Sequence, residues 1–367
     1  MRAVDELASG RLASALGVHP VTARCLLGRG QTSLGEADAF LNPRLASLRP
    51  PEDLAGFPQA VDRLVHAIGQ KETIGIFGDY DVDGVTTTAL LTIFLRRAHA
   101  HVVPRVARRD GGYGFQPEHV HDFAQAGCRV IVTVDLGTQD FDAIAAARAA
   151  GIDVIVVDHH QVPESSQHPA FALVNPHRPD SRYPFRDFAS VGLGFFLAAA
   201  LRTRLCAKGH GAAELDVLDL LDLVAVGTIA DLMPLVAENR ILVTRGLRVL
   251  NHRARRGLAA LLARAQVPVD RTIDEITVGW KLGPRLNAPG RLGDAAPALE
   301  TLLAADAESA NTWADALEEA NQKRREIADE THRQAVTLAQ AQSDRAALCV
   351  AQIGWLHGVV GIVAARL

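Results

Sequence analysis

The chain has 367 residues, of which 48% are hydrophobic and 22% charged, and its formal net charge is −4. This composition predicts a packed globular core with two domains, and the acidic balance argues against a broadly basic nucleic-acid-binding surface. The cysteines Cys25, Cys128, Cys206 and Cys349 form no C-x-x-C pair, which disfavours a zinc site or a disulfide framework. The first residues lack an apolar signal core and no stretch has the length of a membrane span, so we expect a cytoplasmic protein.

The first part of the chain is expected to be helical. Residues 1–48 contain short amphipathic helical segments that end at Gly30 and Pro43. The pair Pro50–Pro51 indicates a linker before a predicted helix over 57–70. Runs of β-branched residues then alternate with helical patterns as far as residue 160. This alternation predicts βαβ units and a parallel sheet, with acids at the C-terminal strand ends where ligands gather in such folds. The expected strands lie within 73–81, 100–106, 128–137 and 152–160, and the expected helices between them are 84–98, 117–127 and 140–151.

The pattern becomes helical after about residue 190, and a second unit begins near residue 270 with a long helix over 307–341. The predicted fold class is α/β, in which a parallel-sheet catalytic domain is connected by a helix to a smaller α/β domain. The predicted units are an N-terminal helical segment at 1–48, a catalytic domain at 49–236, an Arg-rich connecting helix at 237–267 and the smaller domain at 268–367.

Three acids alternate after the first strand, in the segment Asp79-Tyr80-Asp81-Val82-Asp83-Gly84. Hard divalent cations such as Mg²⁺ and Mn²⁺ prefer carboxylate oxygens. Because alternate side chains of a strand share a face, we expect the three carboxylates to enter one site, where a cation offsets their repulsion. A calcium-binding loop is disfavoured, since it needs a glutamate at its twelfth position, which is Leu90 here.

Acids also follow the next two strands. Asp135 ends one strand, either as a cap or as a ligand, and Asp158-His159-His160 ends the next. A lone histidine is more often structural. Neutral imidazole is nevertheless a metal ligand that a neighbouring acid orients, so this triplet indicates a metal site when it occurs beside the other acids.

The segment DLVAVGTIAD contains two further candidates, Asp222 and Asp231. On one helix they lie roughly 13 Å apart, so one ion cannot bind both, and either is a candidate for the last ligand. Acid motifs that converge on one sheet edge indicate two metal ions and hydrolysis at phosphorus.

Taken in order, Asp81 with Asp83, Asp135, Asp158-His159-His160 and VGTIAD resemble the four motifs of the DHH phosphoesterase superfamily. The RecJ branch fits best, because further segments resemble it and together cover nearly the whole chain. These segments are FGDYDVDGVTTTALL (77–91), DGGYGF (110–115), VNPHRPDSRYPFRDFASVGLG (174–194), DLVAVGTIADLMPLVAENRILV (222–243), PRLNAPGR (284–291), ANQKRREI (320–327) and WLHGVVGIVAARL (355–367).

The resemblance implies two bound ions, Mn²⁺ or Mg²⁺, with Asp79 as an added acid and His160 at the scissile phosphate. It favours Asp231 over Asp222, because the superfamily places an acid four residues after a glycine and Gly227 has that spacing. The implied metal ligands are Asp81, Asp83, Asp135, His159 and Asp231, and the implied catalytic residues are these five together with Asp79 and His160.

Two positions depart from the family pattern. Phe77 stands where the superfamily often has a histidine, and RecJ-like sequences use the extra acid instead. Leu136 follows Asp135 where the RecJ branch commonly has asparagine, which affects a contact beside the metal ligands and not the metal site itself.

The resemblance further implies a DHH-associated domain across a cleft, with Arg and Asn side chains that bind phosphates without sequence preference. The chain ends within a segment similar to the glycine-rich strand–helix of that domain, so we expect the domain to be incomplete, and its missing part to add an OB-fold. Taken without the resemblance, 284–287 is better interpreted as a loop and 322–327 as a solvated helix face. The implied nucleic-acid-binding residues are Arg109, Tyr113, Arg285, Asn287, Arg291, Asn321 and Arg324.

The implied function is a processive 5′→3′ exonuclease that hydrolyses single-stranded DNA to 5′-mononucleotides by two-metal catalysis, in DNA recombination and repair. Its implied partners are single-stranded DNA, a helicase and a single-strand binding protein. Two alternatives stay open, a phosphodiesterase of oligoribonucleotides or cyclic dinucleotides and a non-catalytic Cdc45-like DNA-binding scaffold. A plain nucleotide-binding module is disfavoured, because no G-x-G-x-x-G or P-loop is present.

Overall fold

The computed structural model describes residues 5–163, 167–211, 214–340, 342 and 346–367. Its centre is a parallel five-stranded sheet in the order β2-β1-β3-β4-β5. This sheet confirms the α/β class, and four of its strands lie within the expected ranges. The fifth strand was not expected, because three residues between turns carry too little periodicity to predict a strand. The strands are β1 (Thr73–Gly78), β2 (His101–Val106), β3 (Cys128–Val134), β4 (Asp153–Val157) and β5 (Ala172–Val174).

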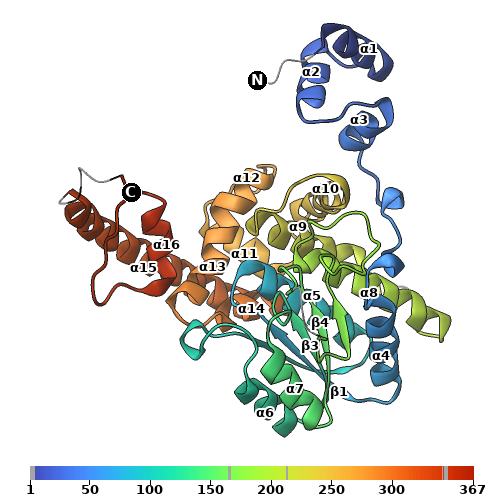
Figure 1. Cartoon of the computed structure of the whole chain (residues 1–367), viewed down its shortest axis with the longest axis vertical. Helices are drawn as coiled ribbons and strands as arrows, with labels where there is room; N and C mark the ends of the chain where they lie inside the picture. Colours follow the sequence, from blue (N-terminus) through green and yellow to red (C-terminus); the bar gives the residue numbers. More distant parts are fainter. Residues whose placement is uncertain (1–4, 164–166, 212–213, 341, 343–345) are drawn as a thin grey trace.

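Helices cover both faces of the sheet (Figure 1). Successive strand side chains point to opposite faces, so Val130 and Val132 join one core while Ile131 joins the other. The first core is covered by α4 (Phe57–Gly69), α5 (Val82–Arg97) and α8 (Ser190–Ala207). The second is covered by α6 (Pro117–Gln125) and α7 (Phe141–Ala149).

The helix α8 is long and apolar enough to cross a membrane by length and composition alone. Within the structure 61% of that stretch is buried, and α8 packs against α4 and α5. A core helix of a globular domain passes the same test, so α8 is weak support for a membrane span.

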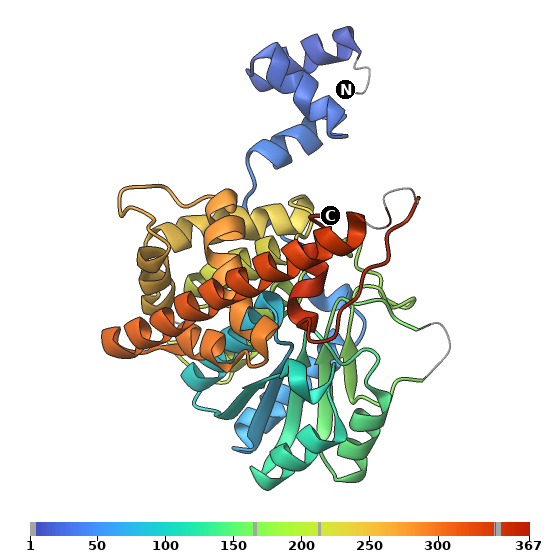
Figure 2. The same cartoon turned by 90° about the vertical axis from the view of Figure 1, so that its left-hand side faces the viewer.

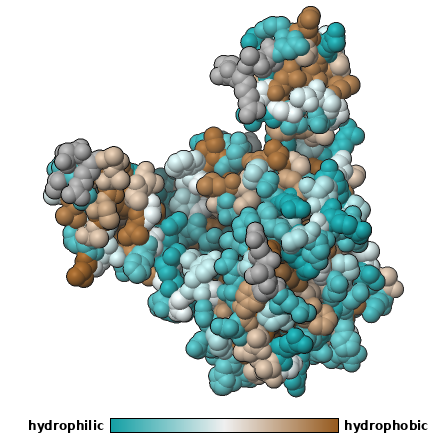
Figure 3. Space-filling view, viewed as in Figure 1, coloured by the Kyte–Doolittle hydropathy of each residue, from teal (hydrophilic) through white to brown (hydrophobic). Residues whose placement is uncertain are grey.

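The N-terminal helices form a small unit that lies apart from the sheet, and Figure 2 shows the same separation from a second side. The unit has its own apolar core around Leu12, Ala23 and Leu26, and apolar side chains also reach its surface (Figure 3). Its helices are α1 (Glu6–Leu16), α2 (Pro20–Gly28) and α3 (Leu34–Leu41), and the short turns η1 (Leu45–Ser47) and η2 (Pro51–Asp53) lead to α4.

The stretch after the sheet is helical, with η4 (Leu218–Leu220), α9 (Leu221–Ala230), α10 (Ala237–Asn251) and α11 (Arg256–Arg264). The expectation of one connecting helix over 237–267 is wrong. The chain turns at Arg253, which has a φ of 50° and whose guanidinium donates to the carbonyl of Pro268. This turn lets α10 pack on α9 while α11 packs on the long helix α15 (Ala307–Gln340).

The last part of the chain contains α12 (Glu275–Thr277), the π-helical turn η5 (Val278–Leu282), α13 (Gly283–Leu292), α14 (Ala296–Leu303), α15 and α16 (His357–Ala364). Among the described residues from 268 onward no strand is present, and Asp294 makes one isolated bridge to Arg108. The described residues of this part therefore show none of the strands expected for a smaller α/β domain. The domain boundaries stay predictions.

Candidate metal centre

The C-terminal ends of three neighbouring strands place three acids at one edge of the sheet. Each acid directly follows its strand and adds one more backbone hydrogen bond to the neighbouring strand. The backbone N–H of Asp79 donates to the carbonyl of Val134, that of Asp135 to Val157, and that of Asp158 to Val174. The acids are thus fixed by the sheet itself, as expected for ligands of an open α/β fold.

The expectation that Asp79, Asp81 and Asp83 share one face of a strand is wrong. The strand β1 ends at Gly78, Asp81 is the N-cap of α5, and Asp83 lies in the first turn of that helix. The tight strand-to-helix turn requires Gly84, because a Cβ there would lie 2.5 Å from the backbone N of Asp79. The turn, and not strand alternation, therefore brings these carboxylates together.

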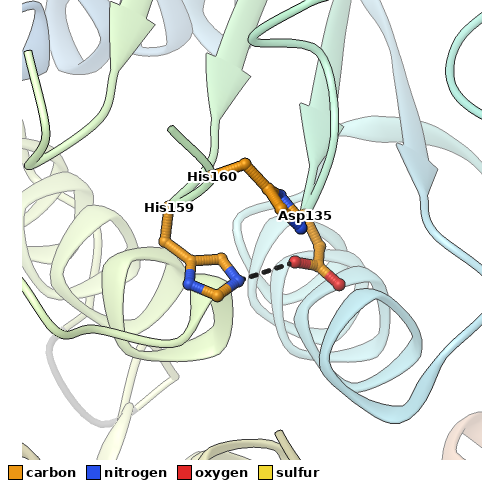
Figure 4. A group of neighbouring side chains, drawn as sticks. All are labelled: Asp135, His159 and His160. Carbon is orange, nitrogen blue, oxygen red and sulfur yellow. Dashed lines mark hydrogen bonds and ion pairs between the residues drawn. The ribbon is translucent and has the colours of Figure 1, made fainter. Parts of the chain in front are cut away.

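His159 lies at the centre of the cluster. Its Nε2 is 3.2 Å from Asp135 Oδ1 (Figure 4), 3.5 Å from Asp231 Oδ2 and 3.8 Å from Asp83 Oδ2. Ligand atoms within 4.8 Å of one another occur in three overlapping groups. These are Asp83 with His159 and Asp231, Asp79 with Asp81 and Asp135, and Asp135 with His159 and His160. The arrangement provides donors for two adjacent ions.

The carboxylates of the cluster are crowded together and are buried or half-buried. Burial, together with the neighbouring Asp81, raises the pKa of Asp79 and of Asp83 to about 7. Burial and the charge of Asp83 raise the pKa of Asp231 to about 7, and its buried Oδ2 has no hydrogen-bond partner among the described residues. Burial lowers the pKa of His159, which favours the neutral imidazole that binds metals. Oxygen and imidazole donors of this kind suit Mn²⁺ or Mg²⁺.

Asp158 organises the loop that carries both histidines. Its Oδ1 accepts from the backbone N–H groups of His159 and His160 and lies 2.7 Å from His160 Nδ1, while its Oδ2 accepts from the N–H of Thr138. Burial alone would raise the pKa of Asp158, but the hydrogen bonds from His160 and Thr138 and the charge of His160 together outweigh burial and lower it to about 2. The hydrogen bond to Asp158 raises the pKa of His160 to about 9. His160 is therefore a half-buried cation near neutral pH, beside the metal cluster.

The two acids of the DLVAVGTIAD segment lie in different environments. Asp231 is the C-cap of α9 and belongs to the cluster. Asp222 is buried at the other end of α9, where Arg255 donates to its carboxylate at 2.8 and 2.9 Å. The structure thus brings Asp231, and not Asp222, to the candidate metal ligands.

Three supporting residues were not predicted from the sequence. The backbone N–H groups of Ser190 and Val191, at the start of α8, donate to the two oxygens of Asp83 at 2.6 and 2.9 Å. Asn175 donates from Nδ2 to the carbonyl of His160. Helix N-termini favour carboxylates, but the sequence does not show which acid lies at the start of α8.

Of the residues expected to bind nucleic acid, two lie beside the cluster on the loop before α6. Arg109 lies over the ring of Tyr80 at 4.1 Å and donates from Nε to the carbonyl of Gly290. Tyr113 is exposed and meets the edge of Tyr80. Tyr80, which the sequence analysis did not assign, therefore connects the acidic turn to this loop.

The other five lie on α13 and α15 and differ in accessibility. Arg285 is only 5% exposed. Its Nε and Nη2 donate to the carboxylate of Glu318, and its Nη1 donates to the carbonyl of Lys281. Asn321 is fully buried and accepts from Arg324. The remaining three line a pocket of about 210 Å³ beside the end of α9; they are Asn287, Arg291 and Arg324.

Residues 73–228 match the family described as DHH family, N-terminal domain. The single-stranded-DNA-specific exonuclease RecJ of Bacillus subtilis is 36% identical over 97% of this chain, and that of Dickeya dadantii is 39% identical over 86%. The matches cover 44% and 56% of those proteins, so the chain spans about half the length of these relatives. The crystal structure of RecJ in complex with Mn²⁺ from Thermus thermophilus superposes with a TM-score of 0.84 at 30% identity, covering 100% of this chain and 51% of that one.

Proposed function

This chain belongs to the DHH family and groups with its RecJ members, and we propose that it is the catalytic part of a metal-dependent exonuclease. Its substrate in this proposal is single-stranded DNA, degraded from the 5′ end to 5′-mononucleotides. The observation that supports the proposal most strongly is the cluster of five acids and one imidazole, all buried or half-buried, that gathers at one edge of the sheet. The relatives named RecJ are described as single-stranded-DNA-specific exonucleases, and RecJ of Thermus thermophilus is solved with Mn²⁺.

Two ions, Mn²⁺ or Mg²⁺, fit the donors of the cluster. Asp81, Asp83, Asp135, His159 and Asp231 are the proposed ligands, with Asp79 as an added acid. Bound ions of this kind activate water and stabilise the attacking and leaving oxygens at phosphorus. The α8 amides that bind Asp83 fix that carboxylate before any ion arrives, which lowers the reorganisation that binding requires.

The charged imidazole of His160 is the proposed contact to the scissile phosphate. Asp158 binds its Nδ1 and holds its proton, so Nε2–H is left to donate to a phosphate oxygen. Arg109 and the pocket residues Arg291 and Arg324 extend this positive surface along the proposed path of the strand. Such contacts bind phosphate without reading sequence, as an exonuclease needs.

The recombination and repair role, the helicase and single-strand binding protein as partners, and the cytoplasmic location are part of the same proposal. They rest on the RecJ relatives and not on a feature of the described residues. The two alternatives are less favoured. A Cdc45-like scaffold does not require the complete set of ligands found here, and the relatives are exonucleases of DNA, not small-substrate phosphodiesterases.

The test is nucleotide release from single-stranded DNA in the presence of Mn²⁺, with the label placed at either the 5′ or the 3′ end. The proposal predicts that a 5′ label appears at once as a mononucleotide and that a 3′ label appears late. Asp135→Ala is expected to abolish release, whereas Asp142→Ala, which changes an exposed acid of α7, is expected to retain it. Hydrolysis of dinucleotides without release from DNA would instead favour the small-substrate alternative, and DNA binding without any hydrolysis would favour the scaffold.

A further inference from the structure

Leu232 occupies an unfavourable position directly after the proposed ligand Asp231. Its backbone has a φ of 59°, and its side chain is 88% exposed. The N–H of Leu232 donates to the carbonyl of Ile229 and that of Met233 to Thr228, which closes the end of α9 with Leu232 in the left-handed conformation. Helices usually place glycine there, because a Cβ disfavours that conformation. A leucine at this position is therefore strained and also exposes an apolar side chain to water.

The pocket beside Leu232 is lined by two chemically different kinds of side chain. Leu232, Ile229 and Ile362 contribute apolar groups, and Arg291 and Arg324 contribute guanidinium groups. The buried Nε of Arg324 has no hydrogen-bond partner among the described residues. An occupant that offers both an apolar face and anionic oxygens matches both kinds of lining. A nucleotide has this chemistry, since its base has an apolar face and its phosphate is an anion.

We propose that Leu232 is a specificity-determining residue that packs against the face of an unstacked base next to the scissile phosphate. This inference rests on the proposed function, because it assumes that the strand runs from the metal centre into the pocket. Asp231 and Leu232 are consecutive, so the base contact and the metal ligand are fixed by the same helix end. Bases in a duplex are stacked on both faces, and such a contact therefore favours single strands.

The test compares the binding of a fluorescent oligothymidine with the binding of an abasic oligonucleotide that has the same number of phosphates. Binding is measured by anisotropy in EDTA, so that no hydrolysis occurs. The test variant is Leu232→Gly, which suits the positive φ and removes the side chain without a new strain. The matched control is Gln266→Gly. Gln266 has a φ of 55° in the equivalent bonding pattern at the end of α11, is exposed and uncharged, and is not among the pocket residues.

The wild-type chain is expected to bind oligothymidine more tightly than the abasic strand. Leu232→Gly is expected to weaken oligothymidine binding about tenfold, or about 1.4 kcal/mol, and to leave abasic binding unchanged. Gln266→Gly is expected to bind both strands as wild type does, and thermal unfolding of both variants is expected at or above the wild-type temperature. A wild-type base preference that survives in Leu232→Gly, or no base preference in the wild type, overturns the inference.

The inference and the proposed function fail separately. If the wild type releases 5′-mononucleotides and Leu232→Gly keeps the base preference, only the role of Leu232 is contradicted. If Leu232→Gly abolishes the base preference but the wild type releases no nucleotides from DNA, the exonuclease activity is contradicted and the base contact is supported.

Discussion

At the scale of single residues, Asp222 and Asp231 lie on one helix and serve different purposes. We predict that Asp231→Ala weakens Mn²⁺ binding by at least about 100-fold while the protein stays folded, since ligand loss exceeds the roughly 10- to 100-fold effect of a supporting residue. Asp222→Ala is predicted to lower the free energy of unfolding by about 3 kcal/mol, because it leaves Arg255 buried without its partner. Calorimetric titration with Mn²⁺ and urea unfolding of both variants would check this. Retained Mn²⁺ affinity in Asp231→Ala would show that another residue completes the site.

The raised pKa values of the cluster predict how metal binding depends on pH. The pKa values of Asp79, Asp83 and Asp231 are about 7 in the fold, against 3.8 normally. Their contribution to stability is therefore fully present below about pH 3.8 and is lost as the pH rises through about 7. Because bound cations replace these protons, Mn²⁺ is predicted to raise the unfolding temperature more at about pH 8 than at about pH 5.5. Equal increments at both pH values, measured by circular dichroism against EDTA controls, would contradict this.

The residues of the metal centre could be predicted from the sequence only in part. The acids and histidines could be predicted, because each follows a recognisable strand or helix end. The partners that orient them could not, since the amides of Ser190 and Val191 reach Asp83 from more than 100 positions away in the chain. For the same reason, the pairing of Arg285 with Glu318 has no signal in the sequence around either residue.

At the scale of elements, α9 packs closely against the first turns of α5 and α8 through Gly227. A Cβ at Gly227 would lie 2.3 Å from Thr86 Oγ1 and 2.8 Å from Val191 Cγ1. We predict that Gly227→Ala lowers the free energy of unfolding by about 1–3 kcal/mol through overpacking. It should also weaken Mn²⁺ binding, because the new Cβ would approach Asp83 Oδ1 to 3.3 Å.

The control for this prediction is Gly69→Ala, near the end of α4. A Cβ there meets nothing within 4 Å, and the residue is exposed. That variant is expected to unfold in urea as the wild type does or at a slightly higher concentration. Equal unfolding midpoints for Gly227→Ala and the wild type would mean that α9 can move away from α5 at little cost.

The helices and strands could be predicted from the hydrophobic periodicity of the sequence to different degrees. Strands β1 to β4 and their intervening helices were predictable, because near-continuous apolar runs between glycine-rich ends indicate buried parallel strands. The turn after β1 was not, since alternating acids fit either a strand or a helix start, and Asp81 serves as an N-cap. The break between α10 and α11 was also missed, because an Arg-rich stretch gives no stop signal.

At the scale of the whole molecule, α13 and α15 bring Arg291 and Arg324 to the pocket beside the end of α9. Arg324→Ala is predicted to weaken single-stranded DNA binding equally for all sequences and to reduce the salt slope by about one, as loss of one phosphate contact does. Arg285→Ala is predicted mainly to lower the free energy of unfolding, by about 2 kcal/mol, because Arg285 joins the two helices through Glu318. Binding titrations at several salt concentrations and urea unfolding would separate the two. A salt slope altered by Arg285→Ala and not by Arg324→Ala would reverse the assignment.

The proposed function requires the acid and histidine cluster to be a two-metal centre. Its most direct test is an anomalous difference map from crystals of this chain grown with MnCl₂. We predict two peaks, one among Asp83, His159 and Asp231 and the other among Asp79, Asp81 and Asp135, with Asp135 between them. An absence of peaks in the cluster, or Mn²⁺ bound only elsewhere on the chain, would contradict the account.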